Sequence, residues 1–105
     1  MWQIKTSHEV DQFIDNLEIT TQGKIRNVIN LLKEYGHLLR TPHSKKIIGH
    51  DNLFELRSSG NSPVRLFYTV HKNEYYILRG FVKKTNKTPI REINTAISRI
   101  GELTS

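Results

Sequence analysis

Hydrophobic residues in the first third of the chain recur with the spacing of one strand and two amphipathic helices. Residues 2–5 alternate apolar and polar, which predicts a short strand with Trp2 and Ile4 facing inward. Two helical stripes follow, and the second helix runs to Tyr35 with Gly36 as its left-handed end. The stripes consist of Val10, Phe13, Ile14 and Leu17, and then of Ile25, Val28, Ile29 and Leu32. This pattern predicts a helical hairpin.

The start of the first helix is marked by the polar residues before it. Thr6 and Glu9 have the spacing of a capping box, in which each side chain satisfies a backbone N–H group near the other residue. The hairpin also carries several acids, which would repel a polyanion: Glu9, Asp11, Asp15 and Glu18. We therefore expect the hairpin to serve as scaffold or to contact a protein partner.

The second half of the chain has the alternation of β-strands. Residues 53–58, 64–71 and 75–83 are predicted strands, and short connections rich in turn residues join them into an antiparallel meander. Alternation splits each strand into two faces. The predicted core face, covered by the hairpin, holds Phe54, Leu56, Leu66, Tyr68, Val70, Tyr76, Leu78 and Val82. The opposite face holds Glu55, Arg57, Arg65, Phe67, Thr69, Ile77, Arg79, Phe81 and Lys83.

This second face has the chemistry of a surface for single-stranded nucleic acid. Its cations can neutralise phosphates, while Phe67 and Phe81 offer rings on which bases stack. The alternative is that both rings pack beneath the last helix and that Glu55 pairs with Arg57. That helix, predicted over residues 89–100, has its own apolar stripe, which must pack on something: Ile90, Ile93, Ile97 and Ile100.

A basic segment joins the last strand to the last helix. Arg79, Lys83, Lys84 and Lys87 precede Thr88-Pro89, which is typical of a helix start. Thr88 can cap free N–H groups, and Pro89 suits the first helical position because its missing N–H would have no partner there.

Composition indicates one soluble domain spanning residues 1–105, with 36% hydrophobic and 25% charged residues. The expected order of one strand, two helices, three strands and a helix indicates an α+β fold. The net charge of +6 is uneven: residues 1–39 hold four Lys/Arg and five Asp/Glu, whereas residues 40–99 hold twelve and four. Such a concentrated basic region suggests a polyanion partner, although a merely solvated basic face is the alternative. The chain has no cysteine, no apolar run of membrane-spanning length and no signal-peptide segment at its start, so we expect a cytoplasmic protein.

Residues 37–52 show no clean period, and a connection of this length in a compact domain is usually functional or mobile. Lys45 and Lys46 are candidates for a basic clamp on nucleic acid, or for a solvated turn. His37, His43 and His50 lack the close spacing of a ligand pair and no acidic cluster joins them. We therefore expect structural or exposed histidines, and neither a metal site nor a cofactor.

Four motifs occur in a recognisable order. They are Lys45-Lys46, Glu55-Leu56-Arg57, Arg65-Leu66-Phe67-Tyr68 and the run GFVKKTNKTPIREI over residues 80–93. In this combination the chain resembles the phage-derived HigB-like branch of the RelE/ParE superfamily of type II toxin–antitoxin toxins. The resemblance covers most of the chain and implies an antiparallel sheet with two N-terminal helices on one face and a C-terminal helix.

The resemblance also implies a function. RelE-like and HigB-like members cleave mRNA at the ribosomal A site, whereas ParE-like members poison DNA gyrase, so the fold alone does not decide the activity. We expect a metal-independent endoribonuclease that acts on ribosome-bound mRNA and is neutralised by an antitoxin, a helix-turn-helix protein encoded beside it. A gyrase poison and a non-enzymatic RNA-binding module are the alternatives.

Residues that match the family motifs are the site candidates. The catalytic set is Arg57, Arg65, Lys83, Lys84 and Lys87, and the RNA-binding set is Lys45, Lys46, Phe67, Arg79 and Phe81. A ribonuclease needs a base, a proton donor and cations for the charge that develops on the phosphorane. Many RelE-like sites carry a tyrosine or histidine near the C-terminus, but this chain has neither after Tyr76, which leaves the general acid open.

Overall fold

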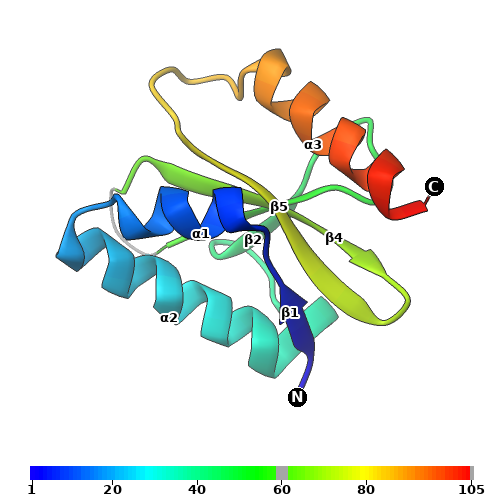
Figure 1. The fold of residues 1–105 in the computed structure, drawn as a ribbon, viewed down its shortest axis with the longest axis horizontal. Coiled ribbons are helices and arrows are strands. Elements are labelled where there is room, and N and C mark those ends of the chain that lie inside the picture. The colour runs from blue at the N-terminus through cyan, green and yellow to red at the C-terminus, as the bar shows by residue number, and fades with distance from the viewer. Residues whose placement is uncertain (59–61, 105) are drawn as a thin grey trace.

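The structure is a computed structural model that describes residues 1–58 and 62–104. Its elements follow the predicted order, with two short additions after α2 (Figure 1). They are β1 (Gln3–Lys5), α1 (His8–Asp15), α2 (Ile19–Tyr35), the 3-10 turn η1 (Gly36–Leu38), β2 (Ser44–Lys46), β3 (Phe54–Arg57), β4 (Val64–His71), β5 (Glu74–Val82) and α3 (Ile90–Thr104).

The strands form one sheet in the order β1-β5-β4-β3-β2. The pairs β3–β4 and β4–β5 are antiparallel, as predicted, and β2 is antiparallel to β3. Strand β1 lies parallel to β5, so the sheet is mixed. A parallel pair requires a long crossover connection, and here the helices and three strands between β1 and β5 provide it. The edge strand β2 lies within residues 37–52, where the sequence pattern predicted no strand.

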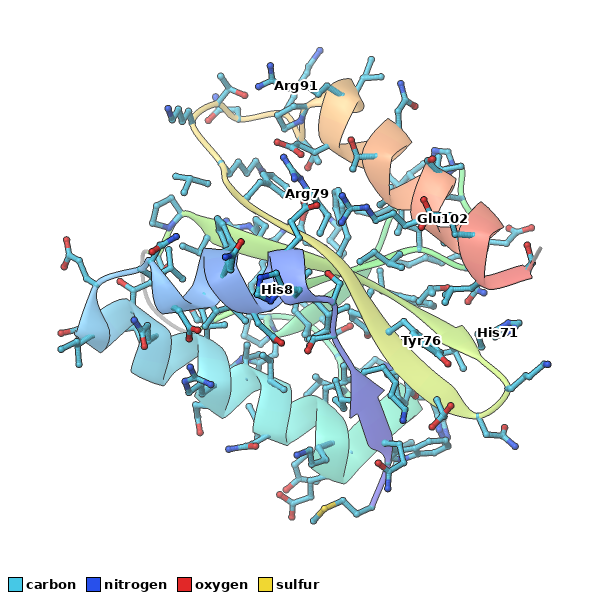
Figure 2. All side chains as sticks on the ribbon, in the orientation of Figure 1. His8, His71, Tyr76, Arg79, Arg91 and Glu102 are labelled. Carbon is cyan, nitrogen blue, oxygen red and sulfur yellow. The ribbon has the colours of Figure 1, made fainter. Side chains whose placement is uncertain are left out.

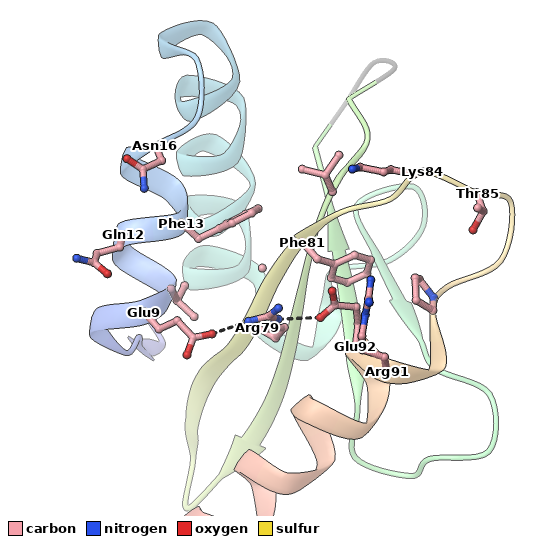
Figure 3. Close-up of a pocket in the computed structure, with 14 residues that line it drawn as sticks. Glu9, Gln12, Phe13, Asn16, Arg79, Phe81, Lys84, Thr85, Arg91 and Glu92 are labelled. Atoms are coloured by element: carbon pink, nitrogen blue, oxygen red, sulfur yellow. Dashed lines mark hydrogen bonds and ion pairs between the residues drawn. The ribbon is translucent and has the colours of Figure 1, made fainter.

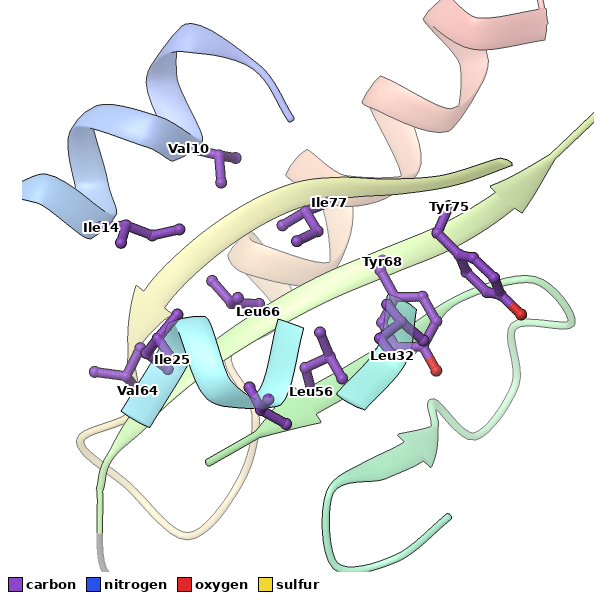
Figure 4. Close-up of a cluster of buried hydrophobic side chains, with 11 residues drawn as sticks. Val10, Ile14, Ile25, Leu32, Leu56, Val64, Leu66, Tyr68, Tyr75 and Ile77 are labelled. Atoms are coloured by element: carbon purple, nitrogen blue, oxygen red, sulfur yellow. The ribbon is translucent and has the colours of Figure 1, made fainter. Parts of the chain in front are cut away.

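Helices cover both faces of the sheet (Figure 1). The hairpin of α1 and α2 packs on one face over a core that includes Leu56, Leu66 and Tyr68 (Figure 4). On the opposite face, α3 packs over Phe67, Leu78 and Phe81. The binding face expected from the sequence is therefore partly covered, and its open part lies toward β2 and β3.

A β-bulge changes the faces of β5. Phe67 lies opposite Arg79 while the next residue, Tyr68, lies opposite Ile77, so Leu78 is an extra residue in β5. Tyr75 and Ile77 consequently pack under the hairpin, whereas Tyr76 and Leu78 pack with α3. The predicted alternation is therefore wrong for Tyr76, Ile77 and Leu78.

Val82, which the alternation placed in the core, is also exposed. The predicted alternation of β3 and β4 is confirmed.

Two glycines allow close approach between elements. Gly36 has φ of +54°, as expected of the residue that ends α2, and a Cβ there would lie 2.2 Å from the indole Nε1 of Trp2. Gly80 lies under α1, where a Cβ would lie 2.4 Å from the Phe13 ring. These contacts place β1 against the end of α2, and α1 directly on β5.

Both predicted helix starts are displaced by one residue. Ser7, not Thr6, is the N-cap of α1 and accepts from the Val10 N–H, while the Glu9 carboxylate binds arginines instead of closing a capping box. The Pro89 carbonyl accepts the N–H groups of Glu92 and Ile93 and so begins the hydrogen bonding of α3.

The packed face of α3 also differs from the predicted stripe. Ile90 is 73% exposed and Ile97 is exposed as well. The residues that pack on the sheet are instead Ile93, Ala96, Ile100 and Leu103.

Candidate nucleic-acid interface

A basic pocket of about 300 Å³ lies at the open part of the sheet, between β2, β3 and the segment that leads into α3. It is lined by Lys45, Lys46, Ile47, Ile48, Glu55, Arg57, Lys83, Asn86, Thr88 and Ile93, and we call it the basic pocket. Arg57 ends β3, where its N–H donates to the His43 carbonyl, and Lys83 follows β5, where its N–H donates to the Pro63 carbonyl. Strand ends thus position two cations from distant parts of the sequence.

Glu55 organises the floor of this pocket. Its carboxylate is 2% exposed and lies 2.8 Å from Arg57 Nε and 3.5 Å from Arg65 Nε. Thr88 Oγ1 lies 3.5 Å from the other carboxylate oxygen. A buried carboxylate is stable only when it is paired and hydrogen-bonded, and these neighbours supply that pairing. Sequence reasoning treated Glu55 only as the single acid on a basic face, or as a surface partner of Arg57.

Arg65 is held firmly beside Arg57. The two residues lie directly opposite each other on β3 and β4, and Arg65 Nη1 donates to the Ser62 carbonyl at 2.8 Å and to the Val64 carbonyl at 3.1 Å. Burial lowers the pKa of Arg65, the Glu55 carboxylate opposes this change, and the neighbouring Arg57 adds to it. Two guanidinium groups with one carboxylate leave an excess positive charge next to the pocket, which favours an anion.

Lys45 and Lys46 lie on opposite sides of β2. Lys45 pairs with Glu55 across the ladder, whereas Lys46 pairs with Phe54, whose ring packs on the hairpin side. Alternation along a strand therefore directs Lys45 toward the basic pocket and Lys46 away from it. The predicted clamp is split between the two faces, although both residues line the pocket at the strand edge.

The remaining catalytic candidates separate from this centre. Lys84 lines a different cavity, and Lys87 lines none of the described pockets. Both are exposed in the segment between β5 and α3, where the Thr85 hydroxyl donates to the Lys87 carbonyl. Of the five predicted catalytic residues, the structure brings together Arg57, Arg65 and Lys83.

The two predicted stacking rings are buried beneath α3. Phe67 is 0% and Phe81 4% exposed, and their ring centroids lie 5.0 Å apart within the second core cluster. Their rings are not open to bases in this structure, so the expectation of stacking on Phe67 and Phe81 is wrong. The alternative weighed from the sequence, packing beneath the last helix, is confirmed.

Arg79 bridges α1 and α3 (Figures 2 and 3). Its guanidinium lies 2.6 Å from Glu9 and 2.7 Å from Glu92, and Glu9 also binds Arg99 at 2.6 Å. The hydrogen bond to Glu92, followed by that to Glu9, raises the pKa of Arg79 against the effect of burial. With both carboxylates bound, Arg79 has a structural role here, and it lines a cavity of about 680 Å³ between α1, β5 and the start of α3.

Within residues 1–58 and 62–104, no group of three or more His, Asp or Glu side chains is arranged to hold a metal ion. No helix in the same part of the chain combines the length and apolar character needed to cross a bilayer.

Comparison with known proteins agrees with this architecture. The family model described as phage derived protein Gp49-like (DUF891) matches residues 12–100. A crystal structure of the isolated RelE toxin of E. coli superposes with a TM-score of 0.66, covering 95% of this chain and 99% of that one at 14% identity. No curated protein matches the sequence significantly. The RelE-like arrangement expected from the sequence motifs is therefore confirmed for the fold.

Proposed function

The chain belongs to the Gp49-like family of phage-derived proteins, and on this premise we propose that it is the toxin of a type II toxin–antitoxin system that cleaves ribosome-bound mRNA. The proposal that the chain is a toxin is supported by the fold that it shares with the E. coli RelE toxin. The nuclease hypothesis is supported above all by one observation: the Glu55 carboxylate forms ion pairs with both Arg57 and Arg65 next to the basic pocket.

In the proposed reaction, the 2′ hydroxyl of a nucleotide loses its proton to a base as its oxygen attacks the adjacent phosphorus. The bond from phosphorus to the 5′ oxygen breaks, and this oxygen takes up a proton from a general acid. The products are a 2′,3′-cyclic phosphate and a 5′ hydroxyl. Negative charge grows on the phosphorane oxygens, and preorganised cations that face this charge stabilise the transition state most. Arg57 and Lys83 line the pocket and would contact these oxygens. Arg65 would supply charge from behind Glu55, and Lys45 would hold the RNA backbone at the edge of the sheet.

The partners follow from the same proposal. The ribosome and its mRNA are the target, and a helix-turn-helix antitoxin encoded beside the toxin would neutralise it in the cytoplasm. Lys84 and Lys87 outside the basic pocket, and Lys46 at its edge, remain candidates for contacts with RNA backbone, because their side chains are exposed.

Cleavage by purified variants on programmed ribosomes tests the proposal. Arg57→Gln and Lys83→Gln should each lower the single-turnover cleavage rate by roughly 100-fold, the usual effect of losing one transition-state donor. Arg65→Gln should also lower this rate, but by a smaller factor, because Arg65 supplies charge from behind Glu55. Lys45→Gln should instead weaken binding and reduce its salt slope by about one unit, as the loss of one phosphate contact does. Mapping of mRNA 5′ ends and ribosome cosedimentation measure the two effects.

Lys72→Gln is the matched control, because Lys72 is an exposed cation in the β4–β5 turn, outside all the described pockets. Its cleavage rate and binding should equal those of the unmodified protein. A wild-type protein that leaves mRNA intact while gyrase-dependent DNA breaks accumulate in cells would refute the nuclease and support a gyrase poison.

A further inference from the structure

A second cavity lies on the hairpin face of the sheet, near the edge formed by β2. It has a volume of about 510 Å³, within the range of small-molecule sites. Three rings from the sheet, those of Phe54, Tyr68 and Tyr75, form part of its wall, and we call it the aromatic cavity. The other lining residues are His37, Leu39, Arg40, Thr41, Ser44, Lys45, Lys46 and Val70.

The cavity contains a buried tyrosine whose hydroxyl is left without a partner. Tyr75 is only 2% exposed, and its hydroxyl makes no hydrogen bond to any residue in the described part of the chain. Tyr68 differs, because its hydroxyl is hydrogen-bonded to that of Ser44. Figure 4 shows the two phenol groups side by side, with their hydroxyl ends pointing out of the hydrophobic cluster. Burial raises the pKa of Tyr75, so its hydroxyl stays protonated and can donate to a ligand.

The rim of the cavity is basic. Arg40, Lys45 and Lys46 line it together with His37, and its lining residues include no Asp or Glu. Arg40 is held in place by a hydrogen bond of 2.8 Å to the His37 carbonyl. Lys46 Nζ lies 3.9 Å from Asp51 Oδ1, and this ion pair is weak because both side chains are exposed. Flat apolar walls, one free donor and a cationic rim fit a planar ring that carries an anionic group.

The aromatic cavity adjoins the basic pocket at the edge of the sheet. Lys45 and Lys46 line both, because β2 is the edge strand and its side chains alternate between the faces. We propose that the aromatic cavity binds one nucleotide of the RNA strand held at the basic pocket. The base would lie against Phe54, the least buried of the three rings, with an edge toward the Tyr75 hydroxyl, and its phosphate would contact Arg40 and Lys46. This inference rests on the proposed function and adds a subsite to it.

Because Lys45 and Lys46 line both cavities, this surface favours a nucleotide over an acidic peptide, the other ligand with similar chemistry. An acidic peptide with an aromatic side chain would also suit the cavity, and its carboxylates would be attracted to the cations of the basic pocket. A nucleic acid fits better, because every repeating unit of it carries both a ring and an anionic group. An RNA strand that crosses β2 uses both sites at once. Rings and basic groups in combination are the usual means of holding single-stranded nucleic acid.

Titration of the ¹⁵N-labelled full-length protein with UMP, AMP and inorganic phosphate tests the proposal by NMR. The nucleotides should shift the amide signals of residues 37–46 and Tyr75, and phosphate alone should leave Tyr75 unshifted. Tyr75→Phe keeps the ring and removes the free donor, so it should weaken nucleotide binding about 3- to 10-fold, the effect of one hydrogen bond. Arg40→Gln should weaken binding by a similar factor.

Tyr76→Phe is the matched control, because Tyr76 is the adjacent residue but packs on the α3 side of the sheet. Its nucleotide affinity should equal that of the unmodified protein. Shifts confined to Arg57, Arg65 and Lys83 would refute the aromatic subsite and leave the proposed function standing. The absence of any shift would count against both. Binding of the peptide acetyl-Glu-Phe-Asp-amide at residues 37–46, without binding of nucleotides, would refute the proposal and assign the cavity to a protein partner.

Discussion

Glu55 shows how one side chain determines the character of a basic site. Arg57 and Arg65 face each other across β3 and β4, and like charges directly opposite on a sheet repel. The buried carboxylate lies against both groups and offsets that repulsion. It orients Arg57 through a hydrogen bond to Nε, whereas the carbonyls of Ser62 and Val64 hold Arg65. In the proposed function, Glu55 would therefore be a positioning residue that acts through its two arginines.

Glu55→Gln should separate this role from simple stability. The amide keeps the shape of the side chain but not its charge, so the arginines would repel each other and lose their alignment. We expect cleavage to fall roughly 10- to 100-fold, an effect similar to that of losing the orienting partner of a metal ligand. A double-mutant cycle with Arg65→Gln should show strong non-additivity, measured by single-turnover cleavage. Glu74→Gln, which removes the exposed ion pair with Lys5, is the control. Additive effects would contradict a positioning role.

Glu9 gives a pH dependence to the stability of the fold. The hydrogen bond from Arg99 and that from Arg79 lower the pKa of Glu9 from its ordinary 4.5, against an opposing effect of burial. A carboxylate whose pKa is lower in the folded state stabilises fully above its unfolded pKa, and this stabilisation is lost as the pH falls through the folded pKa.

At pH 7 and low salt, Glu9→Gln should therefore lower the midpoint of thermal unfolding by about 2 to 6 °C, the effect of two partly exposed ion pairs. Well below pH 4 the variant and the unmodified protein should unfold at nearly the same temperature. Glu34→Gln, on the exposed side of α2, is the control. An equal loss at both pH values would show that the ion pairs do not cause the effect.

At the scale of the element, the apolar periods of the sequence predicted most helices and strands correctly, but they did not reveal local irregularities of the sheet. The strands β3 to β5 and the two helices of the hairpin were predicted within a few residues, because each carries a clear apolar period. The bulge at Leu78 has no counterpart in the sequence pattern, since one extra residue in a strand preserves an apolar run while reversing its faces. The strand β2 was missed because its residues, Ser44 to Lys46, include no apolar side chain, so no alternation of apolar and polar positions marks it.

Alanine substitutions at Leu66 and Leu78 test this assignment of faces. Both side chains are buried, and each truncation should lower the free energy of unfolding by roughly 2 to 5 kcal/mol in urea denaturation. Their local effects should differ, because Leu66 packs under the hairpin and Leu78 packs under α3. Hydrogen exchange should therefore accelerate mainly in α3 for Leu78→Ala and mainly in α1 and α2 for Leu66→Ala. Faster exchange in the hairpin for Leu78→Ala would show that the bulge is misplaced.

At the scale of the whole molecule, the sequence located the basic face but not its extent. Charge and strand alternation brought Arg57, Arg65 and Lys83 to one side of the sheet, as the structure has them. The same reasoning assigned Phe67, Phe81 and Arg79 to the RNA-binding set, because strand alternation alone could not decide whether α3 covers that part of the face. The acidic hairpin, expected to serve only as scaffold or partner surface, also supplies Glu9 to the ionic bridge with α3. Contacts of this kind depend on distances between elements far apart in the sequence.

The parallel pairing of β1 with β5 also constrains when this protein can finish folding. Gln3 lies opposite Glu74, so β1 leaves the ribosome long before its partner strand exists. At usual rates of synthesis the delay is roughly 4 to 14 s, far longer than a helical hairpin needs to form. Trp2, the only tryptophan, contacts the ring of Tyr75 on that partner strand, so its native environment is completed only after the sheet has formed. The sheet of a nascent chain therefore stays incomplete until most of the chain has been made, and the Trp2 indole reports when β1 pairs with β5.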